Sequence, residues 1–302
     1  MRGILIEAFS LIAIGMVSRL VGLIDEKDDR IISRLVFNVT LPFLVFLAMF
    51  DQRPSYVYLK ITVLAWVLLG IFTAATYYLA RGVIKDPKRL GVFVLTSVGG
   101  NTAFLGYAVI QGLIGSRGMP VAVIYDQFGN GIFIYTVLLL LVSYLVHKSL
   151  GPRALLSGIL TPPFIALMAG LVFPSSVHIP SYIMRAFELV GGVTTPLMML
   201  IVGMNLAKSI KLSSIPVLGT VSVIKLALVP AVMYLFAVVA RVPAFPMKIA
   251  VLQSAMPSMM TSVIFAQIYE LDEPLAAQIV FATTFISFFT LPFIWTLLRH
   301  AY

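Results

Sequence analysis

Long apolar runs, separated by short charged or proline-containing stretches, recur along the whole chain. Each run has about 20 residues, the length that an α-helix needs to cross about 30 Å of hydrocarbon. Charged stretches such as "DEKDDR" at 25–30 and "RGVIKDPKR" at 81–89 separate the runs. The pattern predicts an all-α polytopic membrane protein with ten transmembrane helices. The predicted helices cover residues 4–24, 31–50, 58–80, 90–114, 119–147, 154–173, 183–207, 213–240, 246–269 and 274–298.

Composition agrees with this picture. Of the 302 residues, 60% are hydrophobic and 11% are charged, whereas about a quarter of the residues in a soluble domain are charged. The first run follows Arg2, as in a signal peptide. Its length, and the span that follows it at once, favour a first helix that is retained in the mature protein.

The net charge of +9 lies mainly in the short loops between the predicted helices. This distribution indicates membrane orientation rather than nucleic-acid binding. The loop face opposite the termini carries more Lys and Arg residues than the face that holds both termini, and the richer face is expected to be cytoplasmic. We therefore predict a multi-pass protein of the cell membrane with both termini extracytoplasmic.

Several kinds of chemistry lack the residues that they need. The sequence has no cysteine, so it forms no disulfide and offers no thiolate. Its three histidines, His147, His178 and His300, lie far apart at predicted helix ends or loops and form no metal set. The acids within the spans do not pair with a nucleophile or a base. We therefore expect neither an enzyme nor a bound cofactor or metal.

Two pairs of similar stretches suggest an internal repeat. "NVTLP" at 38–42 in the second span matches "GVTTP" at 192–196 in the seventh, and "LTSVGGN" at 95–101 in the fourth matches "LQSAMPS" at 252–258 in the ninth. The offsets are 154 and 157 residues, so one shift aligns both pairs. The pattern predicts two five-helix halves, 1–150 and 151–302. Because five is odd, the second half would be inverted, as in secondary transporters. Chance similarity among apolar helices is the alternative.

The fourth and ninth spans each contain helix breakers at corresponding places. Gly99 and Gly100 leave the backbone free to unwind, and Pro257 removes a helical hydrogen bond. Freed backbone groups in hydrocarbon cost several kcal/mol each unless polar groups meet them. Two breaks in register therefore predict a site near the middle of the membrane, although kinks with only a packing role are the alternative.

Such a site favours an anion. The N-terminus of a half-helix carries partial positive charge and free N–H groups, which suit a carboxylate. No Arg or Lys lies at either break, so a bound small organic anion could also leave. The candidate substrate-binding residues are Asn101, Gly100, Thr102, Asn130, Pro257, Ser258, Asn38 and Thr40.

Two charges lie deep within spans. Asp126 in the fifth span shares a helical face with Asn130 at i, i+4, and Lys225 lies midway along the eighth span. Either charge could neutralise helix ends at a crossing of the broken helices. Alternatively, Asp126 titrates and couples transport to protons. For Lys225 we favour the structural role.

Four stretches resemble one family of transporters. "GGNTAFLGY" at 99–107 is similar to the "GNTGFLGxP" signature in the fourth helix of the auxin efflux carrier family, and "LQSAMPSMMTSVIFAQIYELD" at 252–272 resembles its "AMPxATxxxxxAxxYxxD" segment in the ninth. "FNVTLPFLVF" at 37–46 and "YDQFGN" at 125–130 resemble its second- and fifth-helix stretches. The family includes plant auxin exporters and prokaryotic carriers of malate or malonate. The short "HKSLGPR" at 147–153, in place of a long cytoplasmic loop, favours a compact prokaryotic-type member.

The resemblance implies an architecture similar to that of bile-acid symporters and sodium/proton antiporters. Helices 4 and 9 would be broken and cross, helices 1, 2, 6 and 7 would form a scaffold, and helices 3–5 and 8–10 would form a mobile transport domain. A homodimer through helices 2 and 7 is implied as well. By motif, Asn101 becomes the leading carboxylate ligand and Pro257 the second break. Ala108 replaces the family's proline, so we expect the first break to rest on Gly99, Gly100 and Gly106.

The predicted function is that of a secondary transporter. It would move a small organic anion, such as an auxin-like carboxylate, malate or malonate, by alternating access, in the direction of export, with proton coupling or by facilitated transport. A sodium-coupled symporter is one alternative, although the ninth span has no acid before Glu270. A ligand-sensing receptor without flux is the other.

Overall fold

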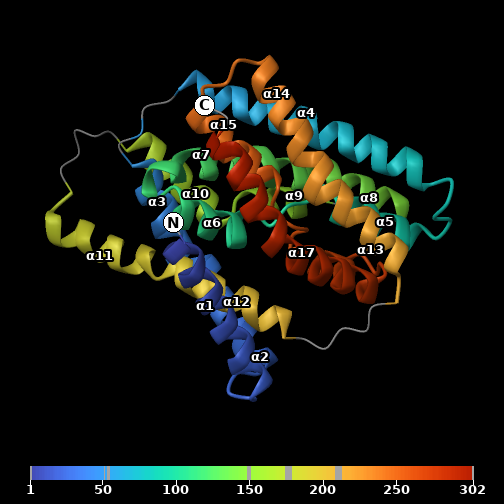
Figure 1. The fold of residues 1–302 in the computed structure, drawn as a ribbon, viewed down its shortest axis with the longest axis horizontal. Helices are drawn as coiled ribbons and strands as arrows, with labels where there is room; N and C mark the ends of the chain where they lie inside the picture. The colour runs from blue at the N-terminus through green and yellow to red at the C-terminus, as the bar shows by residue number, and fades with distance from the viewer. Residues whose placement is uncertain are drawn as a thin grey trace. The chain divides into compact units, whose positions relative to one another are not determined.

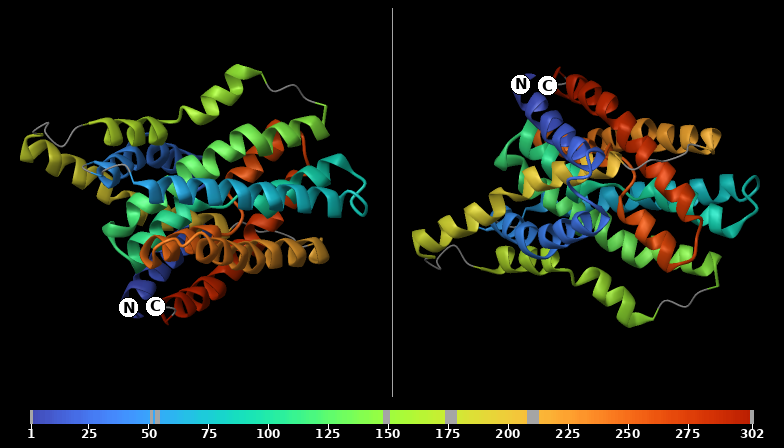
Figure 2. Two further views of the ribbon diagram at one scale, coloured as in Figure 1. Left: turned by 90° about the horizontal axis from the view of Figure 1, so that it is seen from above. Right: turned by 90° about the horizontal axis from the view of Figure 1, so that it is seen from below.

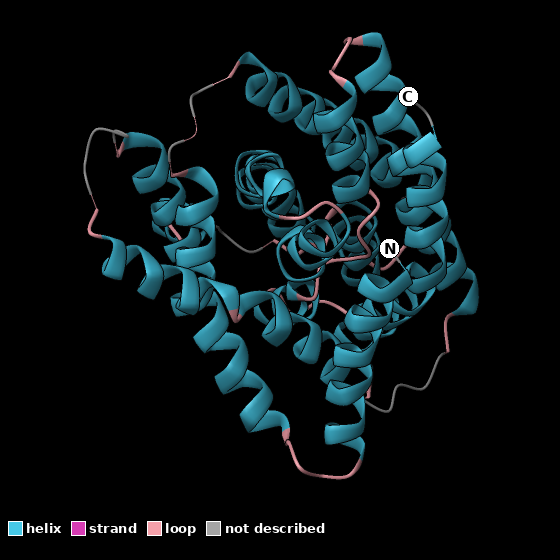
Figure 3. Cartoon of the chain, turned by 60° about the vertical axis from the view of Figure 1, so that its left-hand side comes forward, coloured by secondary structure: helices cyan, strands magenta, loops and turns pink. Residues whose placement is uncertain are grey.

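The computed structural model describes residues 2–50, 52, 55–147, 151–173, 179–207 and 213–300. Helices make up the regular structure of these residues, and no strand is formed within them (Figure 3). His178 and residues 148–150, where the sequence divides its predicted halves, lie outside the described residues. The chain is an all-α membrane protein.

Within the described ranges, six helices are long and apolar enough to cross a membrane. They cover Lys27–Met49, Tyr56–Ala80, Ser116–Leu145, Ser181–Leu206, Ile215–Val239 and Glu273–Arg299. Shorter apolar helices cover Ser10–Leu20, Thr102–Leu113 and Pro162–Val172. Because charged stretches and prolines interrupt the apolar pattern, each long helix coincides with one of the predicted spans, with ends that differ by at most four residues.

Contacts divide the chain into two compact units, which are described separately. Unit 1 comprises Met1–Tyr56, Ala103–Val123 and Ile159–Lys208, and unit 2 comprises Val57–Thr102, Ile124–Gly158 and Ser209–Tyr302. Thus the fourth, fifth and sixth predicted spans contribute residues to both units.

Unit 1 contains two sets of packed helices. Its elements are α1 (Arg2–Leu20), α2 (Glu26–Leu35), the π-helical turn η1 (Val36–Thr40), α3 (Leu41–Met49), α6 (Tyr107–Leu113), η3 (Ser116–Gly118), α7 (Met119–Ile124), α10 (Pro162–Val172), α11 (Ser181–Gly192) and α12 (Thr194–Leu206). The helix α1 crosses α12 (Figure 1), and α3 packs against α10 and α11. A Cβ on Gly203 would overlap the carbonyl oxygen of Ile12, so glycine permits the close approach of α1 and α12.

Unit 2 is built around the long C-terminal helix. Its elements are α4 (Tyr56–Ala80), α5 (Pro87–Val98), η4 (Tyr125–Gly131), η5 (Ile134–Leu138), α8 (Leu139–Leu145), α9 (Pro152–Ile159), α13 (Ile215–Val223), η6 (Ile224–Leu228), α14 (Val229–Val239), α15 (Ala244–Ser254), α16 (Thr261–Ile268) and α17 (Glu273–His300). The helix α17 packs against α13, α16 and α5, and α14 packs against α15 (Figure 2). Lys60 Nζ donates to the Ala240 carbonyl at 3.1 Å, which ties α4 to the end of α14.

One helix begins earlier than the sequence predicts. The second predicted span begins at residue 31, after the acidic stretch "DEKDDR", but α2 already begins at Glu26 within that stretch. Asp25 caps the helix because its carboxylate accepts from the backbone N–H groups of Lys27 and Asp28, and Asp28 Oδ2 accepts from Asp25 N at 3.0 Å. The N–H groups of Asp28 and Lys27 also lower the pKa of the exposed Asp25 carboxyl.

One interruption falls where the sequence predicts a continuous span. The sixth span, 154–173, is divided into α9 and α10. Thr161 is extended, with φ −81° and ψ 157°, and its hydroxyl accepts from Phe164 N. The cause is the consecutive prolines Pro162 and Pro163, since a residue before proline disfavours the helical conformation and proline suits a first helical turn.

Candidate functional site

Two helices of unit 2 are interrupted, and the interruptions pair with each other. The helix α5 ends at Val98, and α15 ends at Ser254. Between these ends and the next helical residues, Asn101 N donates to the Pro257 carbonyl at 2.8 Å and Met259 N donates to the Gly99 carbonyl at 3.0 Å. Gly100 and Ser258 form an isolated antiparallel bridge. Each break thus supplies hydrogen-bond partners for the other, which offsets the cost of leaving backbone groups unpaired in a membrane interior.

Ser258 ties the second break to two other elements. Its hydroxyl donates to the Thr96 carbonyl in the last turn of α5 at 2.7 Å. Its backbone N–H donates to Thr283 Oγ1 of α17 at 3.2 Å. All three residues are buried. The hydroxyl therefore satisfies a carbonyl that the end of α5 leaves without a helical partner.

Asn130 and Asp126 contact the first break from the π-helical turn η4. Asn130 Nδ2 donates to the Gly100 carbonyl at 3.0 Å and to Thr102 Oγ1 at 2.9 Å. The Thr102 hydroxyl donates to Asp126 Oδ1, and Gln127 Nε2 donates to Asp126 Oδ2 at 2.6 Å. π-Helical turns are frequent at functional sites, and this one directs an amide and a carboxylate to the same residue, Thr102.

Lys225 approaches the crossing from another π-helical turn, η6. Its side chain is 2% exposed, and Nζ donates to the Ser254 carbonyl, the last residue of α15, at 3.1 Å. A Cβ on Gly100 would lie 3.2 Å from Nζ. The lysine therefore lies beside both interrupted stretches, in contact with the C-terminal end of one helix.

The partial charges of the helix ends at the two breaks determine which kind of ligand the site favours. The C-terminal ends of α5 and α15 lie on one side of each break, and helix resumes at Thr102 and Thr261 on the other. A helix end carries roughly half a unit charge, negative at the C-terminus and positive at the N-terminus. The first turns after the breaks therefore offer N–H groups and positive potential to an anion.

Most of the residues predicted for the site come together in unit 2. Asn101 is 3% exposed, and its backbone N–H pairs with Pro257. The structure brings the following predicted residues together at the crossing: Gly99, Gly100, Asn101, Thr102, Asp126, Asn130, Lys225, Pro257 and Ser258.

Gly106 differs from the expectation that it helps to break the helix. Its φ of −61° and ψ of −48° are helical. The π-helical turn η2 (Thr102–Gly106) already restores helix at Thr102. The interruption is confined to residues 99–101, because pairing with residues 257–259 satisfies the backbone there.

Asn38 and Thr40 belong to unit 1. Asn38 is exposed, and its Nδ2 donates to the Arg34 carbonyl of its own helix at 2.8 Å. Thr40 is buried, and its hydroxyl has no hydrogen-bond partner within the part of the chain that the structure describes. The same holds for Thr194 in the matching stretch "GVTTP".

Thr283, Ser254 and Thr96 were not predicted from the sequence. A signal existed for Thr283, since it follows Asp126 by 157 residues, the same offset that separates Ser258 from Asn101. The repeat offset thus relates Asp126, the neighbour of the first break, to Thr283, the neighbour of the second. The contacts of Thr96 and Ser254 are backbone carbonyl contacts, for which side-chain identity gives no signal.

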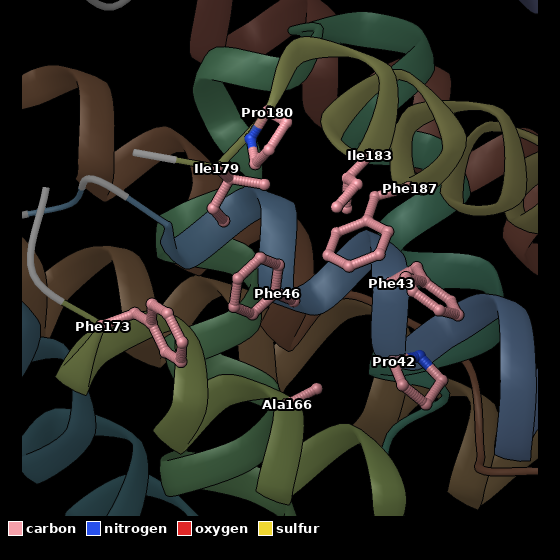
Figure 4. A pocket seen from close by; sticks show the side chains of 9 residues that line it. All are labelled: Pro42, Phe43, Phe46, Ala166, Phe173, Ile179, Pro180, Ile183 and Phe187. Carbon is pink, nitrogen blue, oxygen red and sulfur yellow. The ribbon is translucent and has the colours of Figure 1, made fainter. Parts of the chain in front are cut away.

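The described ranges contain no group of three His, Cys, Asp or Glu residues placed to hold a metal ion. A cavity of about 560 Å³ lies in unit 1 and is apolar (Figure 4). Its lining residues are Pro42, Phe43, Phe46, Ala166, Phe173, Ile179, Pro180, Ile183 and Phe187. None of these side chains donates a hydrogen bond, so the cavity does not offer the partners that a carboxylate requires.

Comparison with known proteins gives consistent results. A family model described as "Membrane transport protein" matches residues 3–295. An uncharacterized transporter of Methanocaldococcus jannaschii is 26% identical over 284 residues, which is 91% of each chain. An uncharacterized transporter of Methanothermobacter thermautotrophicus is 26% identical over 286 residues, which is 93% of each chain. The similarity thus extends over both halves of the sequence.

Proposed function

The chain belongs to the membrane transport protein family, that of the auxin efflux carriers, and from that premise we propose that it carries a small organic anion. As a member of this family it is a multi-pass membrane transporter and not an enzyme. The proposed substrate is a carboxylate such as malate, malonate or an auxin-like acid. The proposed process is secondary transport by alternating access in the direction of export, proton-coupled or facilitated.

The pairing of the two helix interruptions carries this proposal. Residues 99–101 and 257–259 hydrogen-bond to each other, and N-terminal helix ends follow both. Anions bind readily at such ends. Discontinuous helices in secondary transporters place these ends at the substrate site. We propose that Asn101 is the leading ligand of the carboxylate, and that Gly100, Thr102, Asn130, Pro257, Ser258, Asn38 and Thr40 are further substrate-binding residues.

We further propose ten membrane crossings arranged as two inverted five-helix repeats, with both termini extracytoplasmic. Asp126 and Thr283, which are 157 residues apart, each hydrogen-bond to a residue at or next to one of the breaks, Thr102 and Ser258 respectively, and this supports the repeat. The division into units supports a scaffold of helices 1, 2, 6 and 7 and a transport domain of helices 3–5 and 8–10, except that residues 103–123 fall in unit 1 and residues 154–158 of helix 6 fall in unit 2. We propose that motion of the transport domain supplies alternating access and that the chain forms a homodimer through helices 2 and 7.

Counterflow in liposomes tests the proposed function. Vesicles that contain the purified protein and are loaded with an unlabelled dicarboxylate or aromatic carboxylate should accumulate the labelled anion transiently and saturably. Empty vesicles provide the control. A carboxylate that raises the unfolding temperature of the protein without counterflow would instead indicate a receptor. Binding alone stabilises the folded state by mass action, so this result does not require transport.

We expect Asp126→Asn to flatten the dependence of counterflow on pH. The Asp126 carboxyl is 6% exposed and accepts from the Thr102 hydroxyl beside the first break, so its proton would be linked to the site. Asp272→Asn is the matched control, because Asp272 lies at the surface in an ion pair with Arg89 at 3.5 Å. A pH profile that stays the same in Asp126→Asn would leave Asp126 a structural partner of Thr102.

A further inference from the structure

Lys225 is a buried cation with few protein partners. The Ser254 carbonyl is the one hydrogen-bond acceptor of its Nζ among the described residues, and no carboxylate in those residues pairs with it. The side chain is 2% exposed. A buried charge with so little compensation is costly unless another source of negative potential faces it.

The two interrupted helices supply that negative potential. Ser254 is the last residue of α15, and its carbonyl accepts directly from Nζ. Gly100, two residues beyond the end of α5, has its Cα so near that an added Cβ would lie 3.2 Å from Nζ. The C-terminal end of α15 carries roughly half a negative unit charge and contacts the ammonium directly, and the end of α5, two residues from Gly100, adds negative potential nearby.

A free metal cation would bind less favourably than the Lys225 ammonium at the position beside Ser254 and Gly100. Hard cations require several oxygen ligands, whereas a lysine is held by its own chain and needs fewer. The π-helical turn η6 positions Lys225 in the interior of its span, and the absence of a side chain at Gly100 leaves room for the ammonium.

We propose that the Lys225 ammonium is a tethered cation that holds the crossing of the two interrupted helices and takes the place of a coupling metal ion, so that the anion moves without sodium. This inference deepens the proposed function and rests on it. Lys225 acts as a positioning residue: it neutralises the C-terminal helix ends and leaves the N-terminal ends to the carboxylate. The sodium-coupled symporter is thereby disfavoured.

Chemical rescue of Lys225→Ala tests the tethered cation in the purified full chain. Truncation removes the Cγ, Cδ, Cε and Nζ atoms, which n-propylammonium replaces, whereas 1-propanol replaces them without the charge. We expect Lys225→Ala to unfold at a lower temperature than the wild type, as measured by tryptophan and tyrosine fluorescence. We expect n-propylammonium, but not 1-propanol, to raise its unfolding temperature.

Lys60→Ala is the matched control, because Lys60 Nζ also donates to a backbone carbonyl at 3.1 Å but at the end of α14, away from the breaks. We expect the amine to give this variant no more stability than it gives the wild type. Equal effects of the amine on both variants, or of the amine and the alcohol on Lys225→Ala, would overturn the proposal.

Two further variants apply if Lys225→Ala does not fold. Lys225→Met keeps an apolar stem without charge, and Lys225→Arg keeps the charge. We expect Lys225→Met to slow counterflow roughly 10- to 100-fold, and Lys225→Arg to retain more activity. Counterflow of Lys225→Met at the wild-type rate contradicts the tethered cation.

Sodium dependence completes the test. Wild-type counterflow should proceed at the same rate in sodium and in choline buffers, and stimulation by sodium would overturn the proposal. Absence of counterflow by the wild type in both buffers would defeat the proposed function alone, since rescue of unfolding temperature needs no transport.

Discussion

Asn101→Ala should abolish carboxylate binding while the protein remains folded. The side chain lies in the paired stretch 99–101, at the start of the helix that resumes at Thr102. A charge-assisted hydrogen bond contributes about 1.5–3 kcal/mol. Loss of one such bond would weaken binding roughly 10- to 150-fold, and loss of two would bring it below detection. Calorimetric titration of the purified protein with a transported carboxylate measures the change.

Asn205→Ala provides the control for this substitution. Asn205 Nδ2 donates to the Ile201 carbonyl of its own helix at 2.9 Å, so its removal deletes an amide without touching either break. Its affinity and unfolding temperature should stay close to those of the wild type. Unchanged affinity in Asn101→Ala, with the protein folded, would place the anion elsewhere.

Asn130→Leu should destabilise the protein and stop counterflow together. Asn130 Nδ2 is shared between the Gly100 carbonyl and Thr102 Oγ1, and both partners are buried. Leucine has a similar size but no donor. A buried polar group that loses its partner costs about 1–3 kcal/mol, and Thr102 keeps its hydrogen bond to Asp126, so loss of the donor to the Gly100 carbonyl should lower the free energy of unfolding by about 1–3 kcal/mol. Denaturant unfolding followed by fluorescence measures this loss.

Two comparisons separate the lost donor from a change of shape. Asn130→Asp keeps the shape but places an oxygen against the Gly100 carbonyl, so it should be at least as harmful as Asn130→Leu. Gln127→Leu removes a donor to Asp126 that does not reach the break, and it should be milder. Wild-type stability and counterflow in Asn130→Leu would show that this amide does not hold the crossing.

The apolar pattern predicts the helices well where hydrophobicity alone decides their position. Burial in lipid requires long apolar segments, and each of the six long helices coincides with a predicted span to within four residues at either end. Local hydrogen bonding and proline residues determine where individual helices begin and end within or beyond these spans. Asp25 extends α2 into the acidic stretch because its carboxylate caps the helix, and Pro162 begins a new helix within the sixth span. Asp at the N-cap and Pro in the first turn are both typical of helix starts, but hydropathy averaged over a long segment does not show them.

The candidate site could be predicted only in part. Gly99, Gly100 and Pro257 mark where the helices are interrupted, because these residues disfavour helix locally. The i, i+4 spacing correctly places Asp126 and Asn130 side by side, and both contact Thr102. Which elements cross depends on tertiary packing. The partners of Lys225 and Ser258 are backbone carbonyls distant in the sequence, and a carbonyl gives no sequence signal.

The most direct test is the position of a bound substrate. Crystals of the protein with a brominated aromatic carboxylate that is active in counterflow would locate the ligand by anomalous scattering from bromine. We predict that its carboxylate oxygens lie within hydrogen-bonding distance of the Asn101 side chain and of N–H groups in the first turns after the two breaks. A carboxylate bound in the apolar cavity beside Phe46, or continuous helices through residues 99–101 and 257–259, would contradict the account.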